Sequence, residues 1–287
     1  MGRCTNRKHR AALAQETLKI IEKGSYRLDS GEIIDISAYL KRAVHKTILY
    51  RLDDLLDQSD GPVIEAPDRI NGVEITAETT LQAALRFVYE SPELNPLCLN
   101  FASAMNPGGG FLSGSQAQEE SLARSSGLYA CISQMTEMYE YNKKLNTGLY
   151  SDYMIYSPDV PVFRNDEGNL LKIPYVVSFV TSPAVNAGAV RKNEKDNVAN
   201  IRSIMHRRIE RVLRIAKLHG HKAIVLGAWG CGVFDNEPLM IAGLFKEFLG
   251  PGGIYANKFG RVVYAIYDRS AGQEIFEAFR KVLAGTL

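Results

Sequence analysis

A glycine run followed by two adjacent glutamates is the part of this chain best suited to chemistry. Residues 108–110 are all glycine, so the backbone there can adopt left-handed angles and approach a bulky anionic ligand closely. After seven further residues, Gln118, Glu119 and Glu120 stand where a helix is expected to begin. Backbone amides at the start of a helix attract phosphate. The pattern predicts a pocket for a phosphorylated ligand with carboxylates beside it.

Each half of this pattern also has an ordinary structural explanation. A run of glycines is usually a turn, and glutamates in a first helical turn are favoured by the helix dipole alone. The combination is more informative because it follows residues 97–102, a short apolar segment that predicts a buried strand. Open α/β sheets bind ligands in the loops at the carboxyl ends of their strands. Together, these features favour a ligand-binding loop.

A second glycine-bearing loop follows another predicted strand, residues 222–227. It contains Gly230, Cys231 and Gly232, and it leads into a helix expected to begin at Pro238, because proline is favoured at the first helical position. Taken alone, the Gly-Cys-Gly sequence is at least as consistent with a tight turn. Two such loops at strand ends could surround a pyrophosphate with backbone amides from both sides. This would be nucleotide binding without the lysine of a P-loop.

The elements that position these loops alternate between strands and helices from Val73 onward. This alternation is typical of a sheet covered by helices. The predicted strands are residues 73–76, 97–102, 175–181, 222–227 and 261–266, and the predicted helices begin near Thr79 or Thr80, Glu119, Glu194, Pro238 and Gln273. Residues 134–174 form the least regular part, which we expect to contain a hairpin with its turn at residues 165–168.

The first 70 residues have a different pattern. Asn6 can cap a helix that ends at Gly24, a hairpin is predicted around residues 29–31, and Ser37 can open a short helix. We expect residues 1–70 to form an accessory extension of helix and hairpin, packed on a core of residues 71–287.

The composition, with 46% hydrophobic and 23% charged residues among 287, is that of a globular protein with one large core. The formal net charge of +2 argues against a strongly basic nucleic-acid surface, so no direct DNA binding is expected. The four cysteines, Cys4, Cys98, Cys131 and Cys231, lack metal-ligand spacing and are interpreted as reduced thiols. No apolar run approaches the roughly 20 residues that span a bilayer. We expect a cytoplasmic protein.

The stretch from Asn106 to Glu120 resembles the signature of poly(ADP-ribose) glycohydrolases, particularly the compact microbial type built on a macrodomain. Residues 101–107, 116–122 and 230–234 are similar to the same family. The resemblance extends from the N-terminal to the C-terminal helix. It implies a three-layer α/β/α macrodomain-like fold with a mixed central sheet and an N-terminal extension.

The resemblance also implies an activity, namely hydrolysis of the ribose–ribose O-glycosidic bonds of poly(ADP-ribose), free or on ADP-ribosylated proteins, to release ADP-ribose without a cofactor or metal. Glu120 would act as general acid and then as base, and Glu119 would hold ribose hydroxyls. A general acid needs a raised pKa. Partial burial and the charge of Glu119 would raise the pKa of Glu120, whereas the helix dipole would lower it.

The other residues expected to contact the substrate come mainly from the two loops. They are Asn106, Gly108, Gly109, Gly110, Gln118, Gly230, Cys231, Gly232, Val233, Phe234 and Tyr267. The glycines would surround the pyrophosphate and Phe234 would pack on the distal ribose. Tyr267 could stack on adenine, although a core position fits it equally well.

Other functions compete with this one. A macrodomain that only binds ADP-ribose needs no acid at the bond, so Glu119 and Glu120 argue against it, whereas a mono-ADP-ribosyl hydrolase fits the same pocket. A cysteine hydrolase built on Cys231 needs a histidine. His219 and His221 precede the strand that ends at Gly227, which places them roughly 20 Å away. No cluster of His, Cys or Asp has the spacing of metal ligands.

Overall fold

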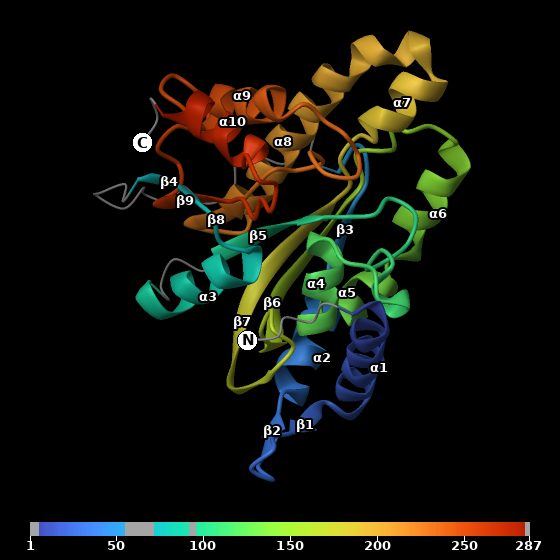
Figure 1. Ribbon diagram of the computed structural model, residues 1–287, viewed down its shortest axis with the longest axis vertical. Coiled ribbons are helices and arrows are strands. Elements are labelled where there is room, and N and C mark those ends of the chain that lie inside the picture. Colours follow the sequence, from blue (N-terminus) through green and yellow to red (C-terminus); the bar gives the residue numbers. More distant parts are fainter. Residues whose placement is uncertain (1–5, 55–71, 92–95, 285–287) are drawn as a thin grey trace.

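A seven-stranded mixed sheet forms the centre of the molecule (Figure 1). The computed structural model describes residues 6–54, 72–91 and 96–284. Its strands in this sheet are β3 (Ile48–Tyr50), β4 (Val73–Thr76), β5 (Pro96–Phe101), β6 (Met154–Arg164), β7 (Leu170–Ser182), β8 (Ala223–Leu226) and β9 (Arg261–Ala265). Their order is β3-β6-β7-β5-β8-β9-β4, with β6 antiparallel to both β3 and β7 and every other pair parallel. All five strands predicted from the sequence are present.

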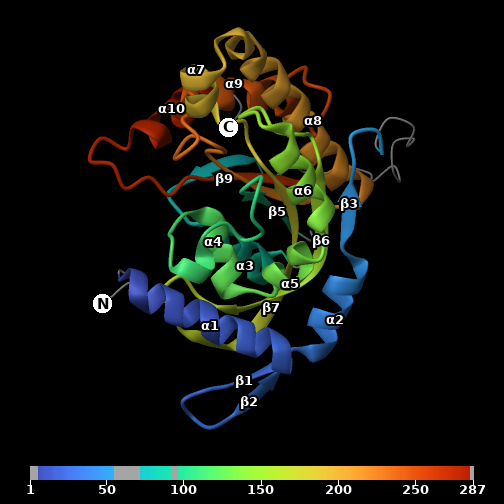
Figure 2. The same cartoon turned by 90° about the vertical axis from the view of Figure 1, so that its right-hand side faces the viewer.

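Helices cover both faces of the sheet. On one face lie α8 (Ile201–Leu218), α9 (Pro238–Leu249) and α10 (Glu274–Leu283), and on the other lie α2 (Ser37–Lys46), α3 (Thr80–Glu90), α4 (Gln118–Ser125), α5 (Leu128–Ser133) and α6 (Thr136–Leu145) (Figures 1 and 2). Strand β5 packs against both helical layers, because successive side chains of a strand point to opposite faces of the sheet. Leu97 and Leu99 pack with the first group, and Cys98 with the second. The expected three-layer α/β/α fold is confirmed.

The N-terminal part begins with α1 (Arg7–Lys23), whose start is capped by Asn6 and whose end is at Gly24, with φ +68°. Strands β1 (Ser25–Arg27) and β2 (Ile33–Asp35) then form the predicted hairpin. Strand β3, which no pattern in the sequence predicted, adds an antiparallel edge strand to the main sheet. Within the region expected to be an accessory extension, this segment therefore belongs to the central layer.

Residues 134–174 are more regular than the sequence suggested. They contain α6 and most of the long β6–β7 hairpin, whose turn lies at the predicted place and is closed by a bond from Gly168 N to Asn165 O (3.1 Å). Pro158 and Pro161 obscured β6, because proline interrupts the hydrogen bonding of a central strand. In the structure, the β6–β7 register shifts between Ser157 and Val160, while β3 pairs only with residues 154–156. Pro158 therefore lies at the bulge, and Pro161 lies beyond the residues that pair with β3.

The long helix predicted from Glu194 begins in the structure as a 3₁₀ helix (Lys195–Asn200) and continues as α8. A helix that was not predicted, α7 (Ala187–Asn193), precedes it. Asn186 caps α7 by accepting a hydrogen bond from Ala189 N (3.0 Å). The Glu194 carboxylate accepts a bond from Gly148 N (2.7 Å), which holds this part of the chain against the loop before β6. This contact lies between α7 and the 3₁₀ helix, and the α-helix itself starts at Ile201 rather than near Glu194.

A buried aromatic cluster joins α8 to the β3 edge and makes stability sensitive to acid. His219 Nε2 and Tyr50 Oη are 2.7 Å apart, and the His219 ring stacks on Tyr156 with centroids 3.6 Å apart. Desolvation lowers the pKa of His219 to about 4. An unfolded histidine binds a proton near pH 6.5, so acid favours the unfolded chain between these two values.

We expect the wild-type protein to lose about 1–2 kcal/mol of stability between pH 7 and pH 4.5 through this residue, after allowance for its partial exposure. His219→Phe should keep the stack and remove that part of the acid sensitivity. The exposed His45, changed to Phe, is the control. Urea unfolding at several pH values measures the effect, and equal acid sensitivity in all three proteins would contradict the assignment.

Candidate active site

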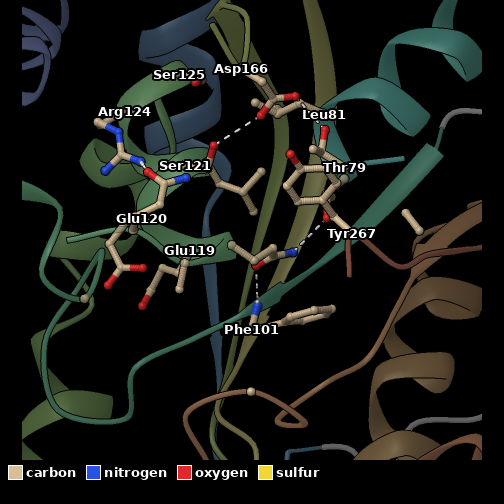
Figure 3. A pocket seen from close by; sticks show the side chains of 18 of the residues that line it. Thr79, Leu81, Phe101, Glu119, Glu120, Ser121, Arg124, Ser125, Asp166 and Tyr267 are labelled. Atoms are coloured by element: carbon tan, nitrogen blue, oxygen red, sulfur yellow. Dashed lines mark hydrogen bonds between the residues drawn. The ribbon is translucent and has the colours of Figure 1, made fainter. Parts of the chain in front are cut away.

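A pocket of about 810 Å³ opens at the carboxyl ends of β5, β8 and β9 (Figure 3). The loops that follow these three strands form much of its wall, together with α4. Of the residues proposed from the sequence, those lining it are Asn106, Gly109, Gly110, Gln118, Glu119, Glu120, Gly230, Gly232, Val233, Phe234 and Tyr267. Gly108 and Cys231 are buried and do not line it. The two glycine-bearing loops thus meet at one pocket, as the strand-end argument predicts.

Glu119 is almost fully buried at the start of α4, with 3% of its surface exposed. Its Oε2 accepts a hydrogen bond from Ser103 N (2.7 Å), and its Oε1 accepts one from Asn100 Nδ2 (3.4 Å). Burial is the main reason that its pKa is raised to about 8, and the charge of Glu120 adds to this, while the hydrogen bonds oppose it. Burial therefore favours the protonated form of Glu119.

Glu120 is only partly buried, and its Oε1 accepts a hydrogen bond from Gly110 N (3.0 Å). Both carboxyl groups converge on Gly109, which has φ +57°. A Cβ built on Gly109 would lie 2.5 Å from Glu120 Oε1 and 3.1 Å from Glu119 Oε2. From the sequence, the balance of burial, neighbouring charge and helix dipole at Glu120 stayed open. In the structure the deeply buried carboxyl group is that of Glu119, which points toward the end of β5.

Gln118 connects the start of α4 to the sheet. Its Oε1 accepts a bond from Phe101 N (2.9 Å), and its Nε2 donates to Leu99 O (2.7 Å) and Thr80 Oγ1 (3.1 Å). From the sequence, this side chain was expected to contact substrate. In the structure, its amide is bonded to β5 and α3, so it fixes the direction in which Glu119 and Glu120 project.

The second loop is shaped by Gly230 and Asn236. Gly230 has φ +75°, and a Cβ there would lie 2.5 Å from Asn236 Nδ2. That amide nitrogen donates to Val185 O (2.7 Å) and to Gly230 O (3.2 Å). A Cβ at Gly232, by contrast, would have no atom within 4 Å, so this glycine leaves open space beside the pocket. Val233, 89% exposed, stands at the rim.

The aromatic residues expected at the site occupy different surroundings. Phe234 lines the pocket and packs near Tyr150, with ring centroids 6.0 Å apart. Tyr267 is 38% exposed and also lines the pocket, so it is not a core residue. The Arg269 guanidinium lies 4.8 Å from the centroid of the Tyr267 ring and donates to its hydroxyl (2.9 Å). A flat ligand group would have to stack on the opposite face of the ring.

The structure argues against the cysteine hydrolase. Burial raises the pKa of the Cys231 thiol to about 12, which disfavours the nucleophilic thiolate. His219 and His221 bond to Tyr50 and Tyr156, at the other end of the sheet. Within residues 6–54, 72–91 and 96–284, no group of three or more His, Cys, Asp or Glu side chains is arranged to hold a metal ion. None of the helices in these ranges is long and apolar enough to cross a bilayer.

Several residues of the site were not identified from the sequence. Ser103 and Asn100 hold Glu119, and Asp166 reaches the pocket from the β6–β7 turn. Asp166 accepts hydrogen bonds from Thr79 Oγ1 (2.5 Å) and Ser121 Oγ (3.2 Å), which joins the turn to α3 and α4 (Figure 3). Ser103 could have been found from its place just after the β5 strand. Nothing in the local sequence distinguishes Asp166 from an ordinary turn residue.

The molecule has a mixed sheet between two layers of helices, and paired carboxyl groups lie beside the glycine loops at the strand ends. This combination defines a macrodomain-type hydrolase. The family described as microbial-type PARG, catalytic domain, matches residues 14–165, and the chain belongs to this family. This confirms the resemblance drawn from the glycine run and the paired glutamates.

Solved structures of poly(ADP-ribose) glycohydrolases resemble this chain over most of its length. The enzyme from Thermomonospora curvata is 44% identical, with a TM-score of 0.87 and coverage of 96% of this chain and 99% of that one, and its complex with the inhibitor ADP-HPD matches equally well. The enzyme from Deinococcus radiodurans in complex with ADP-ribose is 38% identical, with a TM-score of 0.77 and coverage of 85% and 96%. The comparison with curated proteins found no match.

Proposed function

We propose that this protein is a poly(ADP-ribose) glycohydrolase that cleaves ribose–ribose O-glycosidic bonds and releases ADP-ribose. The convergence of Glu119 and Glu120 on Gly109, inside a glycine-lined pocket, is the observation that carries this conclusion. Membership of the microbial-type family and the likeness to glycohydrolases solved with ADP-ribose support it.

The reaction that we propose uses Glu120 as general acid and then as base. Its partly exposed carboxyl group, held by Gly110 N, would protonate the leaving ribose oxygen while positive charge develops on the anomeric carbon. The C–O bond breaks, and the departing ribose keeps the proton as a hydroxyl. A water molecule then adds to the anomeric carbon, and its proton returns to Glu120. Glu119 would hold ribose hydroxyls.

The proton that Glu120 donates would come from the pair of carboxyl groups, Glu119 and Glu120. Since burial raises the pKa of Glu119 to about 8, the pair carries a proton at neutral pH. Ribose hydroxyls that donate to Glu119 would favour its ionised form. Bound substrate would therefore shift this proton toward Glu120, where the leaving oxygen needs it.

The remaining contacts follow from the loops. We propose that Gly110, Gly230 and Gly232 admit the pyrophosphate, that Phe234 packs on the distal ribose, and that the open face of Tyr267 stacks on adenine. The substrate would be the polymer, free or attached to ADP-ribosylated proteins. We also propose a cytoplasmic location, in keeping with the free, buried Cys98, Cys131 and Cys231.

Incubating the purified protein with poly(ADP-ribose) and, separately, with a mono-ADP-ribosylated protein tests the proposal. Chromatography should detect ADP-ribose released from the polymer. Release from the mono-ADP-ribosylated protein alone would instead identify a mono-ADP-ribosyl hydrolase. Calorimetric binding of ADP-ribose without release from either substrate would identify a protein that only binds it.

A further inference from the structure

Three successive backbone carbonyl groups, in the loop between the glycine run and α4, each accept a hydrogen bond from an arginine. The bonds run from Arg7 Nε to Ser113 O (3.0 Å), from Arg10 Nε to Gly114 O (2.8 Å) and from Arg124 Nη1 to Ser115 O (2.7 Å). Arg7 and Arg10 belong to α1, and Arg124 belongs to α4. Hydrogen bonds from a charged donor are stronger than neutral ones. Two helices that are distant in the chain therefore hold one turn.

Helix α1 also packs against the short 3₁₀ helix in this loop, Phe111–Ser113 (Figure 2). Gly114 has φ +77°, and a Cβ there would lie 2.1 Å from Arg7 O, so the backbone of the loop touches the backbone of α1. Ala14 of α1 is buried together with Phe111 and Ala123, which come before and after the turn in the sequence. The position of the loop is thus set by α1 through packing as well as hydrogen bonds.

The turn that the arginines hold fixes the backbone of Gly110. Gly110 O accepts hydrogen bonds from Ser113 N (3.1 Å), Ser115 N (3.1 Å) and Ser113 Oγ (3.0 Å). The N–H group of the same glycine donates to Glu120 Oε1 (3.0 Å). Because three bonds at the carbonyl oxygen restrict rotation of this residue, they also fix the direction of its N–H group. A continuous series of contacts therefore connects the arginines to the carboxyl group of Glu120.

We propose that Arg10 is a positioning residue for the hydrolysis inferred above, on which this inference rests, and that it acts by holding the turn that directs Gly110 N toward Glu120. Without the Arg10 guanidinium, Gly114 O loses this donor and the turn can shift. Glu120 is then held less precisely where it can protonate the leaving oxygen, and such misplacement lowers the rate of the chemical step.

Arg10 is the best of the three arginines for a test. Arg124 is 5% exposed and lies in α4 itself, so replacing it would disturb the helix that carries Glu120. Arg7 is exposed, where a hydrogen bond to the protein is exchanged for one to water at little net cost. Arg10 is partly buried, and its side chain can be replaced without creating a buried cavity.

Arg10→Met removes the guanidinium and keeps an unbranched stem that suits a helix. We expect kcat for ADP-ribose release from poly(ADP-ribose) to fall ~5- to 10-fold, because the bonds to Ser113 O and Ser115 O remain and limit the shift to less than the ~1 Å that costs about 10²-fold. KM and the calorimetric Kd for ADP-ribose should stay within about twofold of the wild type. Arg10→Lys, whose ammonium group can donate to the same carbonyl, should recover most of the rate.

The stoichiometry of ADP-ribose binding, measured by calorimetry on each preparation, counts the folded and binding-competent molecules. Dividing the rate by this number removes any loss that comes from a less stable fold. Arg27→Met is the matched control, because Arg27 Nη1 also donates to a backbone carbonyl, Gly31 O (2.9 Å), within the N-terminal region, and it does not line the pocket. Its kcat should equal that of the wild type.

An Arg10→Met protein whose kcat per binding site matches that of Arg27→Met would overturn this inference while the proposed function stands. A loss confined to KM or to the affinity for ADP-ribose would make Arg10 a substrate contact and would also overturn its assignment as a positioning residue. Failure of the wild type to release ADP-ribose from the polymer would instead refute the proposed function and this inference with it.

Discussion

Glu120→Gln should lower the rate of ADP-ribose release from poly(ADP-ribose) by ~10²-fold or more, while the protein still binds ADP-ribose. The amide has nearly the same shape as the carboxyl group, and its oxygen can still accept the hydrogen bond from Gly110 N. What it lacks is a proton to give to the leaving oxygen and the basicity to activate water. The loss should therefore fall on kcat rather than on KM.

Rates from polymer and calorimetric binding of ADP-ribose, measured on the same preparations, check this prediction. Glu140→Gln is a suitable control, because Glu140 is exposed on α6 and does not line the pocket. It makes the same change of charge and should leave the rate unaltered. A Glu120→Gln protein that turns over polymer within a few-fold of the wild type would rule out Glu120 as the general acid.

Gly109→Ala should have the next largest effect, because one methyl group would disturb both carboxyl groups. Gly109 has φ +57°, and the new Cβ would lie 2.5 Å from Glu120 Oε1. The left-handed conformation costs about 1–2 kcal/mol for alanine, and displacing a reacting group by about 1 Å costs roughly 10²-fold in rate. We expect the polymer-cleaving rate to fall ~10- to 10²-fold, with a small decrease in Tm.

Gly243→Ala provides the comparison for this variant. Gly243 lies in α9, where a Cβ would have no atom within 4 Å, so alanine should only strengthen the helix. Its rate should match that of the wild type and its Tm should be equal or higher. Equal rates for Gly109→Ala and Gly243→Ala would show that the carboxyl groups do not depend on the shape of the glycine loop.

The parts of the fold that could be predicted are those whose signal is local. β5 and β8 are short apolar runs, and each is followed closely by a glycine-bearing loop. Because parallel strands end at one edge of the sheet, the two loops could be expected to meet there. β6 could not be recognised, because its two prolines are tolerated only through a bulge and a short partner strand. The end of α7 likewise depends on Glu194 bonding to Gly148, 46 residues earlier.

The site, like the fold, could be predicted only where its signal is local. The sequence identifies Glu119 and Glu120 as a pair, but which of them is buried depends on Asn100 and Ser103, which the fold brings against the start of α4. Gln118 has a side chain able to bind a ligand, and only the positions of Leu99 and Phe101 show that its amide is already occupied. Asp166 comes from a turn 46 residues after Glu120, and pairing of β6 with β7 is what carries it to the pocket.

The contacts of α1 have a consequence for the order in which the chain can fold during synthesis. Thr17 Oγ1 donates to Arg124 O (2.6 Å), Arg10 Nε donates to Gly114 O (2.8 Å), and each bond joins residues more than 100 positions apart. The ribosome makes α1 about 100 residues before the segment that it packs against, so at ~5–20 residues per second several seconds pass before these bonds can form. The glycine loop beside Glu120 is therefore completed by a helix made earlier in synthesis, and deleting α1 would remove these contacts from the loop.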